Sequence, residues 1–468
     1  MRLYRLFSFI GLLTACTSCI RIGPYGDKNF NPVTRTINPA DVALPEGYKL
    51  EAVAQGLTYP SAITFDENGT LYVIEAGYSY GEDFQTPRLV RINADGSKQT
   101  ILEGDPKTAP WNGVTYRNGY FYIAEGGETA GGNIVRVSRT GERRVLIANL
   151  PTMGDHHTNG PVIGNDNYLY FSTGTATNSG IVGEDNFKFG WLKRHPNFHD
   201  IPCQDITLTG RNYTEKNVLA EGKVTTGAFL PYGTPSTPNQ VIKGQIPCSG
   251  AVMRIPLEGG QPELVAWGFR NPFGLLFHNN QLYLTDNGFD DRGSRPVWAA
   301  PDFLWRVERG RWYGWPDHAA DFSVQPQGQL LASQPNQVPT PLARFGCHSS
   351  AVGMDFSDSD AFGYRGEVFV AQFGDQAPDV GKIYQHVGYK VVRVNPGTGV
   401  ITDFAVNKGR KNGPASRQKS GGLERPVDVK FSPDDRAMYI ADFGVMEITK
   451  SGPAPKKQTG VIWRITKQ

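Results

Sequence analysis

After its first residues, the sequence has no hydrophobic run long enough to cross a membrane. Its 47 basic and 45 acidic residues leave a formal net charge of only +2, and no run of lysine or arginine dominates. This balance gives no support for a nucleic-acid partner. Only 39% of the residues are hydrophobic, whereas there are 55 glycines and 33 prolines. That composition favours short strands joined by tight turns over long helices.

Cysteine is scarce, with five residues, and the first two, Cys16 and Cys19, directly follow an N-terminal export signal. Arg2 and Arg5 precede a short apolar run at 6–13, and Leu-Thr-Ala then leads to Cys16. This pattern predicts a lipoprotein signal peptide at 1–15, with Cys16 as the lipidated first residue. The alternative is an ordinary cleaved signal. In either case we expect an exported protein; with lipid on Cys16 it would be anchored to a membrane and face the periplasm or the cell exterior.

Export makes a disulfide bond probable on chemical grounds, because the compartment is oxidising. Cys203 and Cys248 flank a stretch rich in glycine, proline and threonine, and we predict that they are bonded. Cys347 remains an alternative partner for either of them.

A repeat organises most of the chain. Each copy has a small or polar start, alternating apolar residues, a turn, and an apolar-aromatic strand that ends in glycine. A further strand of the form RLVRI or VIWRI follows each copy. The six copies occupy residues 60–77, 111–127, 157–174, 270–288, 349–374 and 425–444.

Six multi-strand units predict an all-β fold, a six-bladed β-propeller. The last unit lacks an outer strand, and residues 48–53 alternate in a way that would supply it. We expect a linker at 16–45, the propeller at 46–468, and long insertions in blade 3 (about 178–249) and blade 4 (316–346).

Equivalent positions of all blades converge on the central channel of a propeller. Convergent polar groups in such a pocket predict an active site. The residues that open the repeats are Pro60, Ser61, Asn112, His156, His157, Arg270, Asn271, Ser349, Ser350 and Arg425. Those that close the second strands are Glu75, Glu125, Thr173, Asn287, Gln372 and Asp442.

Several of these segments resemble the soluble quinoprotein glucose dehydrogenases and their relatives. Residues 155–164 are similar to the catalytic-histidine segment, 268–274 to the G-x-R-N-P-x-G segment that grips the quinone, and 285–289 to a calcium-binding turn. Residues 302–316 resemble the D-x-x-x-R…Y-G-W-P stretch. Residues 388–394 and 425–427 look most like the sorbosone-dehydrogenase branch.

The resemblance implies a sugar dehydrogenase that passes hydride from a sugar, or a related alcohol or aldehyde, to pyrroloquinoline quinone beside Ca²⁺. His156 would be the catalytic base, with His157 as the alternate, since histidine titrates near working pH. Adjacent strand residues point to opposite sides, so we expect only one of the two histidines to face the channel. No c-type haem motif occurs, so electrons would leave to a separate acceptor, a cytochrome or the quinone pool. The implied cofactor-binding residues are Arg270, Asn271, Arg425 and Lys390, and the implied calcium ligands are the backbone carbonyls of Asn287, Gly288 and Phe289.

The sequence departs from this family at three positions. Thr175 stands where the glucose-oxidising branch has an acidic partner for the histidine, Val427 replaces a second late arginine, and no lysine follows 369–371. A propeller without quinone is the alternative: a lactonase or other hydrolase with a metal on Glu75, Glu125 and Asp442, or a carbohydrate-binding protein. The arginine pair favours the quinone, because a metal site gains nothing from two cations.

Overall fold

Alternating apolar residues produce a fold built almost entirely of strands. The structure is a computed structural model that describes residues 34–79, 83–127, 130–324, 328–409, 411–449 and 452–468. The predicted signal peptide and Cys16 lie outside the described residues. No helix among the described residues is long and apolar enough to cross a membrane.

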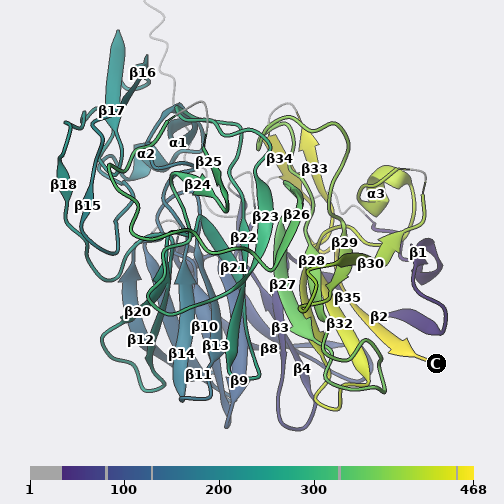
Figure 1. The fold of residues 1–468 in the computed structure, drawn as a ribbon. Coiled ribbons are helices and arrows are strands. Elements are labelled where there is room, and N and C mark those ends of the chain that lie inside the picture. The colour runs from purple at the N-terminus through teal and green to yellow at the C-terminus, as the bar shows by residue number, and fades with distance from the viewer. Residues whose placement is uncertain (1–33, 80–82, 128–129, 325–327, 410, 450–451) are drawn as a thin grey trace, which may run out of the picture. The chain divides into compact units, whose positions relative to one another are not determined.

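Six antiparallel sheets form the blades (Figure 1), five of them with four strands and one, blade 5, with an additional edge strand. Blade 1 is β3 (Pro60–Phe65), β4 (Leu71–Glu75), β7 (Arg88–Ile92) and β8 (Lys98–Glu103). Blade 2 is β9 (Trp111–Arg117), β10 (Tyr120–Glu125), β11 (Gly132–Ser138) and β12 (Arg143–Leu150). Blade 3 is β13 (Thr158–Ile163), β14 (Tyr168–Thr173), β19 (Ala251–Pro256) and β20 (Glu263–Trp267).

The second half of the ring repeats this order. Blade 4 is β21 (Asn271–His278), β22 (Gln281–Asn287), β23 (Pro301–Arg306) and β26 (Ala343–Cys347). Blade 5 is β27 (Ala351–Phe356), β28 (Val368–Gln372), β29 (Lys390–Val394) and β30 (Ile401–Asn407). Blade 6 is β31 (Pro426–Phe431), β32 (Ala437–Asp442), β35 (Gly460–Lys467) and β2 (Tyr48–Leu57). The predicted six-bladed propeller is therefore confirmed.

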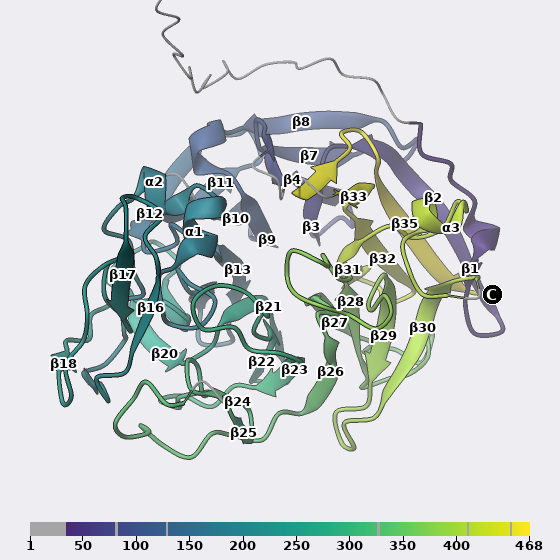
Figure 2. The ribbon, with the colours of Figure 1, turned by 90° about the horizontal axis from the view of Figure 1, so that it is seen from above.

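The innermost strands β3, β9, β13, β21, β27 and β31 pack side by side around the ring (Figure 2). Glycine permits this close approach at particular points. A Cβ on Gly113 of β9 would lie 1.5 Å from the carbonyl oxygen of Gly160, and one on Gly274 of β21 would lie 2.3 Å from that of Val352. Any side chain there would push two blades apart.

Two contacts close the ring between its last and first parts. β2 pairs with β35 in antiparallel register, as expected for residues 48–53. Asp428 on β31 accepts a hydrogen bond of 2.9 Å from the backbone N–H of Ile63 on β3. Burial of this carboxylate raises its pKa to about 6.

Part of the predicted linker belongs to the propeller. β1 (Val42–Ala43) pairs with β30 and adds a fifth strand to blade 5. Before it, the 3-10 helix η1 (Pro39–Asp41) begins after Asn38, whose backbone N–H bonds to the carbonyl of Gly421. The boundary at residue 46 was wrong because a two-residue strand has no detectable alternation. Its strand character comes only from the edge that it covers.

Additional segments stand on one face of the ring (Figure 1). Between β14 and β19 lie α1 (Glu184–Lys188), α2 (Trp191–Arg194), β15 (Ile206–Thr207), β16 (Asn212–Lys216), β17 (Lys223–Gly227) and β18 (Val241–Ile242). Between β23 and β26 lie β24 (His318–Ala319) and β25 (Phe322–Ser323). The other connections contain β5 (Tyr78–Ser79), β6 (Asp83–Phe84), η2 (Pro106–Thr108), α3 (Ala415–Gln418), β33 (Met446–Thr449) and β34 (Gly452–Pro455).

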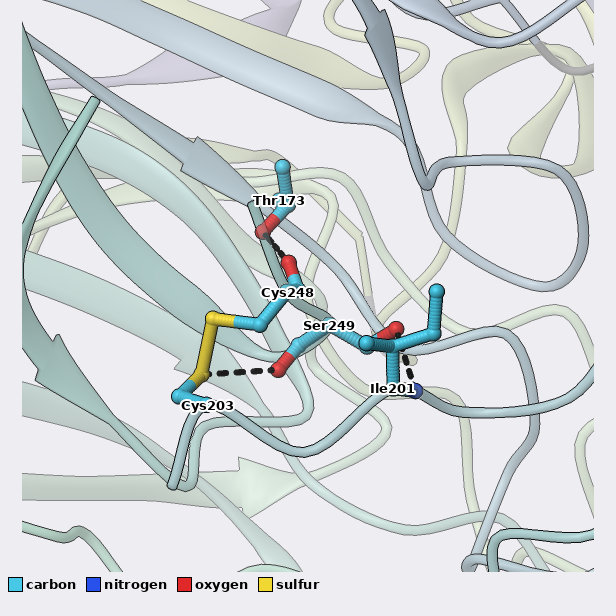
Figure 3. The surroundings of a disulfide bond; sticks show 5 residues. All are labelled: Thr173, Ile201, Cys203, Cys248 and Ser249. Atoms are coloured by element: carbon cyan, nitrogen blue, oxygen red, sulfur yellow. Dashed lines mark hydrogen bonds between the residues drawn. A yellow bond between two sulfur atoms is a disulfide. The ribbon is translucent and has the colours of Figure 1, made fainter. Parts of the chain in front are cut away.

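A disulfide joins Cys203 to Cys248 near the end of the blade 3 insertion (Figure 3). The carbonyl of Cys248 also accepts a hydrogen bond of 2.7 Å from Thr173 Oγ1, at the end of β14. The bond closes a loop with a sequence separation of 45 residues. The chain-entropy account makes such a loop worth about 4 kcal/mol. Cys347 is free.

We predict that Leu57→Ala destabilises the propeller by about 2–4 kcal/mol, because Leu57 is fully buried where β2 pairs with β35 to close blade 6. Leu219→Ala is the matched control, since Leu219 is 54% exposed and should change stability by less than about 0.5 kcal/mol. Urea denaturation of both variants measures the difference. Equal effects would mean that the β2 seam does not stabilise the ring.

Candidate active site

A cavity opens on the face of the ring that carries the insertions. Its volume is about 860 Å³ with the open mouth included. Blades 3, 4 and 5 supply most of the wall. The lining residues are Tyr78, Asp155, His156, Phe189, Trp191, Arg270, Asn271, Asn287, Gly288, Asp290, Arg292, Asp302, His348, Ser350, Gly374, Gln376, Asp379, Val380 and Pro453.

His156 is held in one tautomer. Its Nδ1 lies 2.9 Å from the carbonyl oxygen of Thr175 and 3.0 Å from Thr175 Oγ1. The carbonyl can only accept, and the Thr175 hydroxyl donates its proton to the carbonyl of Thr177, so Nδ1 must carry the imidazole proton. Nε2 is then unprotonated, and burial lowers the pKa of His156 to about 3. Nε2 is therefore available as a proton acceptor.

An acidic neighbour of His156 is present after all. Asp155 Oδ2 lies 3.8 Å from Nε2, on the ring edge opposite Thr175. Burial opposes ionisation of Asp155, but the adjacent guanidinium of Arg292 holds its pKa below the usual range. A proton taken up at Nε2 would thus meet a carboxylate. Thr175 fixes the tautomer, while Asp155 provides the charge that the sequence comparison seemed to lack.

His157 lines a second cavity of about 520 Å³ deeper in the ring, which shares Tyr78, Asn287 and Ser350 with the first. Its Nδ1 is buried and has no hydrogen-bond partner among the described residues. Burial lowers its pKa to about 4. The expectation that only one of the two histidines faces the channel was wrong. Both residues precede β13, so strand alternation does not apply to them.

Two arginines and three aspartates form a buried ion network beside His156. Arg270 Nη2 lies 2.7 Å from Asp290 Oδ2, and Arg292 Nη2 lies 3.0 Å from the same oxygen. Arg292 also pairs with Asp155 and, at 2.6 Å, with Asp185 of α1. The two guanidinium groups hold the pKa of Asp290 far below its usual range despite its burial. The network thereby joins blade 3, blade 4 and the insertion.

Arg270 keeps part of its guanidinium free for a ligand. Nε contacts Asn178, and Nη2 contacts Asp290. Nη1 has no hydrogen bond within the described parts of the chain. By contrast, Arg292 uses all three nitrogens on Asp155, Asp185 and Asp290. Arg270 is thus the arginine that can bind an anion without breaking an ion pair.

The predicted calcium turn, Asn287 to Phe289, reaches the cavity through its first two residues. The side chain of Asn287 is already used, because Nδ2 donates to the carbonyl of Ala351 and Oδ1 accepts from Asn271 Nδ2. Phe289 is 3% exposed and packs in the core. A cation here would therefore have to bind backbone carbonyl oxygens.

Arg425 does not line the cavity, which corrects its predicted role as a quinone clamp. It is 1% exposed, and its Nη1 donates to the carbonyls of Gly374 and Asp375 at 3.2 Å. The guanidinium also lies over the rings of Phe373 and Tyr389. The segment that follows β28 covers it. Arg425 instead positions this segment, which contributes Gly374 and Gln376 to the cavity wall.

Lys390 was also assigned wrongly to the cofactor. Its Nζ pairs with Asp403 of β30 at 2.6 Å, on the outer side of blade 5. Lys390 opens β29, the third strand of its blade, so it lies farther from the ring axis than β27 and β28. Its residue type suggested an anion partner, but its position in the blade excludes it from the cavity.

The three carboxylates of the alternative metal site do not come together. Glu125 pairs with Arg143 at 2.8 Å, Asp442 pairs with Arg35 at 2.5 Å, and Glu75 accepts the backbone N–H of Thr58. Within the described ranges, no group of three or more metal-ligating side chains occurs. These acids instead hold the connections around their own blades.

The lining residues that the sequence analysis did not name as site residues include Asp155, Asp290, Arg292, His348 and Trp191. Asp155 opens the segment 155–164 that the family resemblance singled out, and Asp290 directly follows the segment 285–289, so both lay within reach of the sequence analysis. His348 adopts a left-handed conformation, with φ of +60°, and its buried Nε2 has no partner within the described residues. Trp191 comes from the insertion, where the sequence offers no signal.

Comparison with known proteins places this site in context. Residues 242–393 match the family model described as Glucose / Sorbosone dehydrogenase. The predicted resemblance to this family is thereby confirmed. The glucose/sorbosone dehydrogenase match includes Arg270, Asn271, the 287–289 turn, Arg292 and Asp302. His156 and Asp155 lie before it.

Solved structures share the fold. The PQQ-bound aldose sugar dehydrogenase of Streptomyces coelicolor has a TM-score of 0.52 and 16% identity, over 91% of this chain and 99% of that one. The holo PQQ domain of Coprinopsis cinerea pyranose dehydrogenase has a TM-score of 0.54 and 15% identity, over 91% of this chain and 97% of that one. A calcium structure of the Trichoderma reesei family AA12 protein has a TM-score of 0.55 and 16% identity, over 94% of this chain and 99% of that one. Among curated proteins, none matches.

We predict that His156 stays neutral between pH 5 and 8, with the proton on Nδ1, because burial lowers its pKa and Thr175 accepts from Nδ1. NMR of ¹⁵N-histidine-labelled protein, assigned with a His156→Gln variant, would show bare Nε2 and no titration in this range. His278, which is partly exposed beside Asp358, serves as an internal comparison. A titration midpoint of His156 near pH 6.5 would contradict the predicted neutral state, and a proton on its Nε2 would contradict the assigned tautomer.

Proposed function

We propose that this protein is an exported sugar dehydrogenase that uses pyrroloquinoline quinone and Ca²⁺. The main support is the unprotonated Nε2 of His156 on the wall of a cavity that is also lined by Arg270, whose Nη1 has no hydrogen bond within the described residues. A base and an anion-binding group side by side suit the removal of a hydroxyl proton next to an anionic cofactor. The family match and the PQQ-bound structures of the same fold support this proposal.

The lining residues fit a planar, carboxylate-bearing quinone. Arg270 Nη1, the unpartnered Nε2 of His348 and the amide groups of Asn271 and Gln376 supply hydrogen-bonding groups on three sides of the cavity. Asp290 lies near His348 Nδ1 and raises the pKa of that histidine against the effect of burial. His348 in its cationic form would add a second positive group.

The charge balance explains why a divalent cation should accompany the quinone. Asp155 and Asp290 are matched by Arg270 and Arg292, and Asp379 is matched by Lys188 at 3.3 Å. The lining side chains thus carry no large positive excess to offset several carboxylates. A Ca²⁺ ion on the backbone carbonyls of Asn287 and Gly288 would supply it, and oxygen ligands are those that Ca²⁺ prefers.

The chemistry assigns a separate task to each side chain. When bound, the quinone would accept hydride from the carbon that carries the hydroxyl group. His156 Nε2 takes the hydroxyl proton, and Asp155 stabilises the resulting imidazolium. Thr175 keeps the ring oriented throughout through its carbonyl oxygen and Oγ1. Phe189 and Trp191 from the insertion line the cavity, where their apolar rings would help to exclude water.

The substrate class is a sugar or a related alcohol or aldehyde. Within this class we favour a sorbosone-type substrate on the strength of residues 388–394 and 425–427. Tyr389 and Arg425 of these segments position the cavity wall at Asp375. They would therefore act on the shape of the site rather than by direct contact with the cofactor.

The proposal predicts that the apo-protein binds pyrroloquinoline quinone in the presence of Ca²⁺ and then reduces a dye with some aldoses. His156→Ala should leave quinone binding nearly unchanged and lower turnover by about a hundredfold or more, the usual worth of a positioned base. Arg270→Gln should weaken binding by about 1.5–3 kcal/mol through loss of a charge-assisted contact. Absorbance titration and dye reduction measure the two effects.

Arg309→Ala is the control for these variants, because Arg309 is an exposed arginine after blade 4 strand β23 and should alter neither quantity. Circular dichroism verifies that each variant is folded. The proposal would be contradicted if the wild-type protein bound no quinone at any Ca²⁺ concentration. Loss of binding, rather than turnover, in His156→Ala would remove its role as the base.

We also propose that the protein is anchored by lipid on Cys16. The support is the Leu-Thr-Ala-Cys sequence after the charged and apolar start of the chain. Cys16→Ser should abolish lipid attachment and release processed protein from membranes, whereas Cys19→Ser should remain bound. Fractionation and mass spectrometry of the mature N-terminus make the comparison. Membrane attachment of a processed Cys16→Ser protein would exclude the anchor.

A further inference from the structure

A broad groove with a basic lining lies outside the cavity. Its volume is about 2140 Å³ with the open side included, which exceeds the range of small-molecule sites. Four cationic side chains line it: Lys382, Lys408, Lys411 and Arg417. Among the described residues of its lining there is no aspartate or glutamate. We call this surface, defined by these four residues, the basic groove.

The four cations of the basic groove are exposed, and none takes part in an ion pair among the described residues. Charged groups elsewhere on the same blade behave differently, because Lys390 pairs with Asp403 and Arg393 pairs with Glu367. Two acids of the adjoining segment are occupied, since Asp375 bonds to His386 and Asp379 to Lys188, while Asp291 lies against Gly381 of the groove lining. Uncompensated positive charge in a concavity creates a local field that attracts acidic partners.

One segment of the chain separates the basic groove from the cavity. Gly374, Gln376, Asp379 and Val380 line the cavity, whereas Ala377, Pro378 and Gly381 line the groove. Arg425 and Tyr389 fix the start of this wall through the carbonyl of Asp375. The segment 374–381 is therefore a shared wall between the groove and the cavity.

Exposed aromatic side chains mark the same region. Tyr384 of the groove is 95% exposed, and its ring contacts that of Trp298, which is 55% exposed, at 6.3 Å in an edge-on arrangement. Aromatic residues next to a charged surface are typical of protein interfaces, because they bury much area at a small entropic cost.

We propose that the basic groove is the docking surface for an acidic one-electron acceptor protein. The inference rests on the proposed function, in which oxidation of one CH–OH group to C=O releases two electrons and two protons. The protons pass to solvent. The electrons leave in two successive encounters, each with one oxidised acceptor molecule that is reduced by one electron. A concave surface suits a protruding protein better than a flat membrane, and the thin wall keeps the acceptor near the cavity.

The test compares two forms of one acceptor with opposite charge: native cytochrome c, which is basic, and the same protein succinylated on its lysines, which is acidic. Stopped-flow mixing follows haem reduction by the holoenzyme with sugar present. At about 10 mM ionic strength, the succinylated form should be reduced at least about tenfold faster than the native form. This advantage should decline as ionic strength rises to about 0.2 M, where charges are screened beyond about 8 Å.

The variant Lys382→Glu/Lys411→Glu reverses two charges on the groove. It should slow reduction of succinylated cytochrome c by about tenfold or more and flatten the salt dependence. Reduction of a small uncharged dye should stay within about twofold of wild type. The control, Lys216→Glu/Lys223→Glu, reverses the same number of exposed charges on the β16–β17 hairpin. That hairpin stands on the other side of the ring from α3 (Figure 1 and Figure 2).

Two outcomes overturn the proposal. Equal losses in both double variants would assign the effect to net charge, and an unchanged rate in the groove variant would show that the acceptor docks elsewhere. Vesicles of anionic and neutral lipids, tested on a Cys16→Ser background, provide a third arm. If the groove variant loses only vesicle binding and not acceptor reduction, the groove is a membrane-facing surface.

Failure of the proposed function gives a different signature. Wild-type holoenzyme would then reduce neither dye nor cytochrome. Binding of oxidised succinylated cytochrome c, measured by titration calorimetry without turnover, still tests the groove in that case. Weaker binding of Lys382→Glu/Lys411→Glu, but not of the hairpin control, would support the docking surface, and equal binding of all three proteins would overturn it.

Discussion

The arrangement of the site depends on the buried ion pairs of Arg292. This guanidinium meets Asp155 ahead of blade 3, Asp290 after β22 of blade 4, and Asp185 on α1 of the insertion. Breaking a buried pair by removing one partner typically costs about 3–5 kcal/mol, because a charge is left without compensation. The same contacts keep Asp155 ionised beside His156 and hold the insertion with Trp191 over the cavity.

Arg270 and Arg425 have identical side chains and equivalent positions in their blades, but different surroundings give them different roles. Both precede the innermost strand of a blade, and sequence alone gave them the same role. Around Arg270 the wall stays open, so Nη1 faces the cavity. Around Arg425 the segment 373–375 folds over the guanidinium and uses its donors. One arginine can therefore bind a ligand, while the other shapes the wall between the cavity and the basic groove.

Sequence patterns were sufficient for the blades, because alternation with a period of two is a local property that burial of both sheet faces preserves. They also located His156 and Arg270, which open repeats. They could not find the roles of Arg292 or Trp191, since these residues lie in irregular connections without any period. β1 was missed for the same reason, and the alternation rule misplaced His157 because it was applied before the strand begins.

The sequence by itself determined the all-β class, the six blades, the closing strand and the segments from which site residues come. Only the tertiary structure decided which side chains face the cavity. Packing and ion pairs from distant segments select the tautomer of His156, leave Arg270 Nη1 available, cover Arg425 and direct Lys390 to Asp403. These choices depend on contacts between residues far apart in the chain, and such contacts leave no trace in a local pattern.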